Sequence, residues 1–112
     1  MHAVVALALP AVEAFDLAIP AQVFGDRRLG GRHSFTVCAP VRGLVPSTTG
    51  YAINAAYGLE RLADADTVVV PGYLPLDDPG ERVCSALRRA AARGARMVSV
   101  HRRVRPGRGG PT

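Results

Sequence analysis

The chain has 112 residues, and its 14 basic and 9 acidic side chains give a formal net charge of +5. Every basic residue is an arginine, and four arginines lie in the terminal segment 100–112, which contains no acid: Arg102, Arg103, Arg105 and Arg108. Residues 1–99 alone carry a net charge of only +1. This body therefore gives no electrostatic case for binding nucleic acid or a membrane surface.

The composition favours one domain with a packed core, because 48% of the residues are hydrophobic. Cys38 and Cys84 lie far apart and outside any metal-ligand or CxxC spacing. This excludes a disulfide scaffold and a zinc site, and it suits a reducing cytoplasm. The apolar residues 3–9 lack a cationic flank and the length to cross a membrane, so they indicate neither a signal peptide nor an anchor. We expect a cytoplasmic protein.

The first predicted elements are a buried strand and a short helix. Residues 4–9 form an apolar run that is typical of a strand covered on both faces. Pro20 suits a first helical position, and Gly25 suits a helix end. A helix between them is expected to place Ile19 and Val23 on its inner side.

The middle of the chain predicts strands separated by turns. Alternation over residues 34–39 indicates a second strand, with Phe35 and Val37 on one face. The later segments are a small hairpin or extended excursion within 45–57, a helical turn over 59–65, and a strand over 67–70 closed by Pro71 and Gly72.

An amphipathic helix and a further strand follow. Pro79 opens the helix, which runs to Arg93 and is capped by Gly94. Its expected inward residues are Val83, Leu87 and Ala91. Residues 96–100 then begin another buried strand. Strands that alternate with helices predict an α/β layer fold with a largely parallel sheet.

The tail departs from this order. A buried strand of such a fold is followed by a turn and a covering helix, but residues 100–112 have no helical period and contain two prolines and three glycines. We therefore predict an α/β domain over residues 1–99 and a disordered tail over 100–112.

Four segments after the opening strand carry a resemblance to a known family. They are Phe15-Asp16-Leu17-Ala18-x-Pro20-x-x-Val23-Phe24-Gly25, Val37-Cys38-Ala39-Pro40, Asp64-Ala65-Asp66-Thr67-Val68-Val69-Val70-Pro71-Gly72 and Ala95-Arg96-Met97-Val98-Ser99. On these segments the chain resembles the ThiJ/PfpI family, within the class I glutamine amidotransferase-like superfamily. It is most similar to the N-terminal sensor domain of AraC-type transcriptional regulators. The resemblance implies a flavodoxin-like three-layer sandwich with a mostly parallel sheet, here incomplete.

The resemblance stops at the position where the family has its nucleophile. There, the strand that begins at Met97 leads into an elbow, typically Cys-Thr-Gly followed by an apolar helix. A helix N-terminus favours a thiolate, and nearby backbone N–H groups can hold an anion. This chain has His101-Arg102-Arg103 instead, so we expect no catalytic residue and no thiol-dependent activity.

The genetic code suggests an origin for the tail. A basic set made only of arginine, with many Ala, Gly and Pro residues, indicates a G+C-rich gene. One allowed spelling of residues 100–112, read one base later, gives Cys-Thr-Gly-Ala-Phe-Val-Leu-Ala-Ala-Ala-Gly-Leu. This is the family's elbow and helix, although the middle base of each shifted codon was free to choose. We hypothesise that a frameshift made the tail and truncated the domain.

An alternative gives the tail a role of its own. Arginine-rich segments bind phosphate backbones through salt-sensitive contacts that do not depend on sequence. The tail has no aromatic residue on which a base could stack.

The candidate ligand-binding residues are Asp16, Gly72 and Tyr73. The resemblance places Asp16 at the carboxyl end of the first strand, where open α/β sheets bind ligands. There it could bond a neighbouring thiol or polarise a water. It could instead cap the following helix, and without an elbow cysteine the capping role is favoured. Gly72 could offer backbone N–H groups to an anion or simply permit a tight turn, and Tyr73 would line the same pocket.

The remaining candidates have structural interpretations. Cys38 and Cys84 are expected to be small core residues rather than nucleophiles. His2 and His33 have no paired acid or nucleophile at an informative spacing, so we interpret them as incidental. We expect no metal and no cofactor.

The resemblance implies a truncated ligand-sensing domain of an AraC family regulator. Its intact parent would bind a small-molecule effector here and DNA through a helix-turn-helix domain. The fragment itself is expected to be no enzyme and to lack specific DNA binding and membrane contact. Its relatives commonly form homodimers, and the sequence leaves its own oligomeric state open. The alternative is a fragment of an isonitrile-hydratase-like or other ThiJ/PfpI enzyme that lacks its elbow cysteine.

Overall fold

The computed structural model describes residues 1–29, 31–74 and 78–100. The predicted disorder of the tail and the segment His101-Arg102-Arg103 therefore lie outside the described residues. Val100 belongs to the last strand of the sheet rather than to the tail.

Four parallel strands form the central sheet, in the order β2-β1-β5-β6. They are β1 (His2–Leu7), β2 (His33–Cys38), β5 (Thr67–Pro71) and β6 (Arg96–Val100). Strand β1 lies between β2 and β5, and its residues from Val4 to Leu7 are fully buried. This position explains the continuous apolar run, because a central parallel strand has helices on both of its faces.

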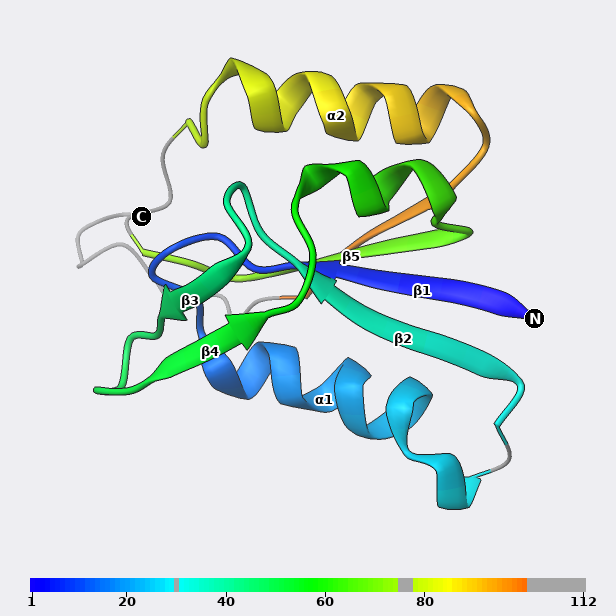
Figure 1. Cartoon of the computed structure of the whole chain (residues 1–112), viewed down its shortest axis with the longest axis horizontal. Coiled ribbons are helices and arrows are strands. Elements are labelled where there is room, and N and C mark those ends of the chain that lie inside the picture. Colours follow the sequence, from blue (N-terminus) through cyan, green and yellow to red (C-terminus); the bar gives the residue numbers. More distant parts are fainter. Residues whose placement is uncertain (30, 75–77, 101–112) are drawn as a thin grey trace, which may run out of the picture.

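The sheet lies between two helical layers (Figure 1). Helix α1 (Ala14–Gly25) covers one face, and α2 (Glu81–Ala92) with the 3₁₀ helix η2 (Leu59–Asp64) covers the other. A short 3₁₀ helix, η1 (Arg27–Leu29), follows α1. The predicted hairpin is present as antiparallel strands β3 (Gly43–Pro46) and β4 (Ala52–Ala55). The predicted α/β fold with a largely parallel sheet is confirmed.

Alternate residues of β1 face opposite layers. Val4 and Ala6 pack with Leu17 of α1, whereas Val5 and Leu7 pack in a larger cluster with residues of η2 and α2. This two-residue period is the normal geometry of a strand. It gives the sheet two cores, one under each helical layer.

Helix α1 differs from its prediction. It begins at Ala14, and Pro20 lies inside it rather than at its first turn. Leu17 and Pro20 are buried, while Ile19 and Val23 are 46% and 57% exposed. Treating Pro20 as a start signal missed the buried positions before it, which continue the helical period toward the N-terminus.

Helix α2 is confirmed with one change of face. Val83, Ala86 and Ala90 are buried, Leu87 is partly buried, and Ala91 is exposed. The predicted inward residues, Val83, Leu87 and Ala91, are spaced four residues apart. Eight residues correspond to a rotation of about 80° away from the starting face at 3.6 residues per turn, so Ala91 was wrongly assigned to the inner side.

Gly94 ends α2 as predicted, with a positive φ of 99° and an N–H that donates to the Ala91 carbonyl at 3.0 Å. An added Cβ would meet no atom within 4 Å, so substitution carries a purely conformational cost. We expect Gly94→Ala to lower the free energy of unfolding by about 1 kcal/mol, and Gly94→Asn by less. Urea denaturation measures both, and equal losses in the two variants would contradict this account.

Strand β6 is present but is not buried as predicted. Among the described residues its only strand neighbour is β5. Met97 is 40% exposed, and Val98 and Val100 are only partly covered. A strand with one neighbour shields its side chains less than a central strand does, and this explains the difference.

Candidate functional site

Three elements meet at the carboxyl edge of the sheet. The Gly72 N–H, just after β5, donates to the carbonyl of Val100, the last residue of β6, at 2.8 Å. The Gly72 carbonyl in turn accepts the N–H of Glu13, immediately before α1, at 2.8 Å. These two bonds hold the first turn of α1 beside the ends of β5 and β6. Open α/β sheets bind ligands at this edge.

Asp16 lies in that first turn and is only 2% exposed. Its Oδ2 atom is buried and has no hydrogen-bond partner among the described residues. The start of a helix favours a carboxylate electrostatically, but a buried polar atom without a partner is costly and rare in native proteins. Among the described residues, therefore, no donor offsets the cost of burying the Oδ2 atom of Asp16.

The capping interpretation of Asp16 is wrong. The residue that precedes the helix is Glu13, and the helix N-terminus has no side-chain capping bond. Asp16 is instead the third helical residue. The motif-based prediction found the correct side chain, but its position within the helix depended on where α1 begins.

Gly72 and Tyr73 differ in their surroundings. The Gly72 N–H is bonded to Val100, so in this arrangement that group is not offered to an anion. Tyr73 pairs with Val12 through an isolated β-bridge and packs against the core cluster on the α2 side of the sheet. The structure thus places Gly72 beside the first turn of α1, and Tyr73 against the opposite layer.

The two cysteines have different environments. Cys38 is completely buried at the end of β2. The pKa of its thiol is raised to about 12, mainly by burial and to a lesser degree by the nearby negative charge of Glu60. The predicted core role of Cys38 is confirmed. Cys84 is only partly buried, with Sγ 3.8 Å from the Asp78 carboxylate. The prediction that Cys84 is a core residue is therefore wrong.

Replacing Asp16 with alanine is expected to raise the free energy of unfolding by about 1 kcal/mol, because it removes a buried polar atom without a partner. The matched control is Asp64→Ala. Asp64 is 68% exposed and pairs with Arg61 at 3.5 Å, so this variant is expected to change stability by less than about 0.5 kcal/mol. Denaturant unfolding of both variants measures the difference. A clear loss of stability in Asp16→Ala would show that the carboxylate serves the fold.

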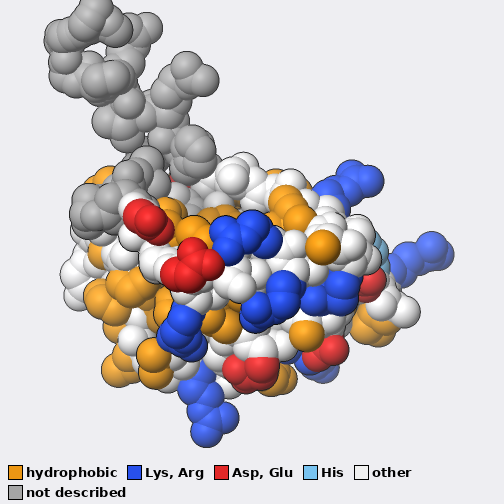
Figure 2. All heavy atoms as spheres, turned by 90° about the horizontal axis from the view of Figure 1, so that it is seen from above, with side chains coloured by type: hydrophobic (Ala, Val, Ile, Leu, Met, Phe, Trp, Pro, Cys, Tyr) orange, Lys and Arg blue, Asp and Glu red, His pale blue; other side chains and the backbone are white. Residues whose placement is uncertain are grey.

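The surface over α2 carries several arginines interspersed with acids (Figure 2). Arg88 pairs with Glu81 at 2.7 Å, and Arg61 pairs with Asp64 at 3.5 Å. In the part of the chain that the structure describes, no group of three or more His, Cys, Asp or Glu side chains could hold a metal ion. Neither described α-helix is long and apolar enough to cross a membrane.

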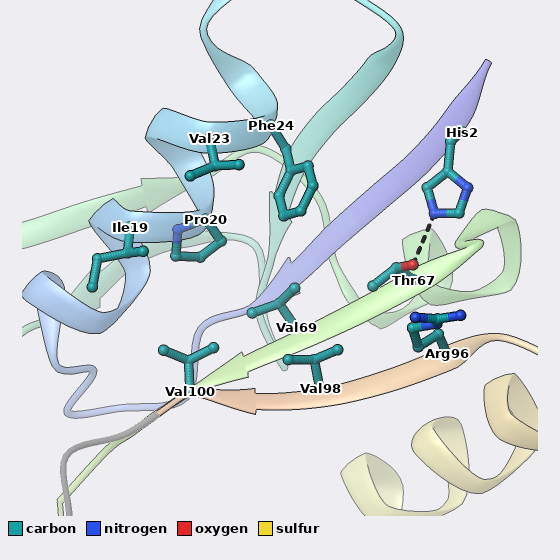
Figure 3. A pocket seen from close by; sticks show the side chains of 10 residues that line it. All are labelled: His2, Ile19, Pro20, Val23, Phe24, Thr67, Val69, Arg96, Val98 and Val100. Carbon is teal, nitrogen blue, oxygen red and sulfur yellow. Dashed lines mark hydrogen bonds between the residues drawn. The ribbon is translucent and has the colours of Figure 1, made fainter.

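Sequence analysis missed one group of polar residues, at the opposite edge of the sheet. His2 Nε2 lies 2.8 Å from Thr67 Oγ1, and Arg96 lies beside them (Figure 3). These residues begin three different strands. Only the parallel alignment of β1, β5 and β6 brings them together, and no sequence spacing could reveal that.

The fold is shared with solved structures of the DJ-1/ThiJ/PfpI superfamily. A DJ-1 superfamily protein from Agrobacterium tumefaciens matches with a TM-score of 0.72 at 16% identity, covering 88% of this chain and 53% of that protein. A DJ-1 superfamily protein from Salmonella typhimurium matches with a TM-score of 0.70 at 25% identity, covering 88% and 55%.

An AraC family transcriptional regulator from Pseudomonas putida also matches, with a TM-score of 0.63 at 23% identity, covering 88% of this chain and 64% of that one. The chain thus spans between about half and two thirds of these structures. No protein-family model and no curated protein matches it.

Proposed function

We propose that this chain is a ligand-sensing domain of an AraC-type transcriptional regulator, acting in the cytoplasm on a small-molecule effector. The observation that carries the proposal is Asp16, a buried carboxylate with an unpartnered oxygen at the carboxyl edge of a parallel sheet. The similarity to a solved AraC family regulator supports the same assignment.

The proposal assigns effector binding and DNA recognition to different parts of the regulator. Among the described residues, the two α-helices are separated by the strand-containing segment between Gly25 and Glu81 and form no helix-turn-helix unit. Specific DNA recognition would therefore come from a part of the regulator outside these residues. The fragment alone is proposed to lack operator binding and to catalyse no reaction.

The end of β6 is the place where a nucleophile would lie in either class of parent protein. Val100 lies beside Gly72 and the first turn of α1 through the two 2.8 Å bonds described above. A cysteine at the end of β6, in the place of Val100 as the shifted reading frame gives, would lie at the same sheet edge as Asp16. Such a pair would suit a regulator's effector pocket and also the alternative, an isonitrile-hydratase-like or other ThiJ/PfpI enzyme.

Sequencing the gene and several hundred bases beyond it tests the proposal. The expected result is a spelling of residues 100–112 that gives Cys-Thr-Gly in the next frame, followed in that frame by helix-turn-helix segments. A stop soon after the sheet would favour the enzyme instead. A spelling that cannot give Cys-Thr-Gly would reject the frameshift.

A mobility-shift titration tests the fragment. Specific, salt-resistant binding of the fragment to the DNA flanking its gene would contradict the proposal that DNA recognition comes from another part of the regulator. The expected result is no binding beyond a weak, salt-sensitive interaction of the same strength with unrelated DNA.

A further inference from the structure

An open groove lies between α1 and the exposed side of the sheet, over β5 and β6 (Figure 3). Its volume is about 540 Å³, within the range of roughly 300–1,000 Å³ that is common for small-molecule sites. The groove explains the exposure of Ile19 and Val23. These side chains project from α1 over the open groove, where no described side chain covers them.

The residues that line the sheet side of the groove alternate along their strands. Alternate residues of β6, namely Arg96, Val98 and Val100, face it, as do Thr67 and Val69 of β5. This spacing is the two-residue period of a strand. The α1 wall consists of Ile19, Pro20, Val23 and Phe24. Seven of the ten lining residues are apolar.

The polar residues lie together at one end. His2, Thr67 and Arg96 line the end of the groove at the amino ends of the strands (Figure 3). His2 and Thr67 are hydrogen-bonded to each other at 2.8 Å. The groove therefore has an apolar body and a polar end that includes a cation.

Arg96 has no carboxylate partner among the described residues. The acid next to it across the strands is Asp66, whose backbone carbonyl accepts the Arg96 N–H at 2.9 Å. The Asp66 carboxylate accepts the Ala3 N–H at 2.8 Å instead. A guanidinium without an acidic partner, at the end of an apolar groove, is complementary to an anionic head group.

We propose that this groove binds a free alkyl carboxylate, a medium-chain fatty acid, with its carboxylate on Arg96 and its chain along Val69, Val98 and the exposed side chains of α1. The distance along β6 from Arg96 to Val100 is about 13 Å at the usual rise per residue. This length limits the alkyl chain that the groove can cover. The inference does not depend on the proposed regulator function, because its polar end lies at the sheet edge opposite Asp16.

Calorimetric titration of the full chain with sodium decanoate tests the proposal. We expect saturable binding, with affinity rising about fourfold for each added methylene from hexanoate to decanoate. Longer acids should gain little, since their ends extend beyond Val100. Amide chemical shifts are expected to change in β6 and in α1 around Ile19 and Val23.

Single substitutions measure separately the contribution of the carboxylate contact and that of the alkyl-chain contacts to binding. Arg96→Gln is expected to weaken decanoate binding about tenfold, whereas Arg42→Gln, at an exposed arginine that does not line the groove, leaves it unchanged. Val98→Thr is expected to weaken binding about fivefold, and Val41→Thr, at a residue that is 75% exposed, is its control. Circular dichroism verifies that each variant is folded.

Three results of the binding experiments would overturn the proposal. They are the absence of saturable decanoate binding, equal affinity for the uncharged methyl ester, and equal loss in Arg96→Gln and Arg42→Gln. A second copy of the chain is the competing occupant. Concentration-dependent dimerisation that perturbs the same α1 and β6 amides, and that decanoate does not reverse, would assign the groove to the dimer and reject the fatty acid.

Discussion

Replacing Leu7 with alanine is expected to lower the free energy of unfolding by about 2–5 kcal/mol. Leu7 ends the central strand β1 and is completely buried in the cluster beneath η2 and α2. Alanine would remove most of the side chain and leave a cavity that the neighbouring strands cannot fill. A loss of this size is a large part of the roughly 5–15 kcal/mol that stabilises a typical domain.

Leu44→Ala is the matched control for this experiment. It makes the same chemical change at a hairpin residue that is 75% exposed, so we expect a change below about 0.5 kcal/mol. Urea titration followed by circular dichroism measures both variants. Similar losses at the two positions would mean that the β1 core is not packed as described.

The second large effect is a loss of stability at high pH that depends on Cys38. The pKa of its thiol is raised from 9.0 to about 12 by burial and by the charge of Glu60. The unfolded chain therefore releases this proton at a lower pH than the folded chain does. The stabilisation is fully present below pH 9 and is lost as the pH rises toward 12, at about 1.4 kcal/mol per pH unit.

Cys38→Ala isolates this contribution, because all other alkaline titrations remain in the variant. The expected difference is a steeper fall in the stability of the unmodified chain between pH 9 and 12, about 4 kcal/mol in total. Unfolding titrations at half-unit pH intervals measure it. Parallel stability curves for the two proteins would contradict a deeply buried thiol.

The sequence predicted the strands well because their signals are local. The apolar run of β1 and the Val68-Val69-Val70 run of β5 each have a composition that favours only a buried strand. The exposure of β6 could not be predicted in this way. Whether a strand is central or at an edge depends on which other segments lie beside it, and residues 96–100 have the same pattern in both cases.

The helices and the candidate site show the same difference between local sequence signals and properties that arise from the packing of distant segments. Pro20 supplied a strong local signal that was outweighed by the packing of Leu17 against β1 and β5, so α1 begins earlier than predicted. Asp16 was found through a motif, but its burial and its unpartnered oxygen are properties of the assembled sheet edge. Arg96 and His2 carried no signal at all, because their proximity arises from strand alignment between distant segments.

The sheet order also sets a gradient of amide protection across the molecule. Strand β1 is hydrogen-bonded on both sides, to β2 and to β5, and its core residues are fully buried. Within the described residues β6 is bonded to β5 alone. The amides of β1 should therefore exchange with solvent deuterium only through global unfolding, while those on the free side of β6 exchange through small local openings. Exchange would thus begin at β6 and reach the centre of the sheet last.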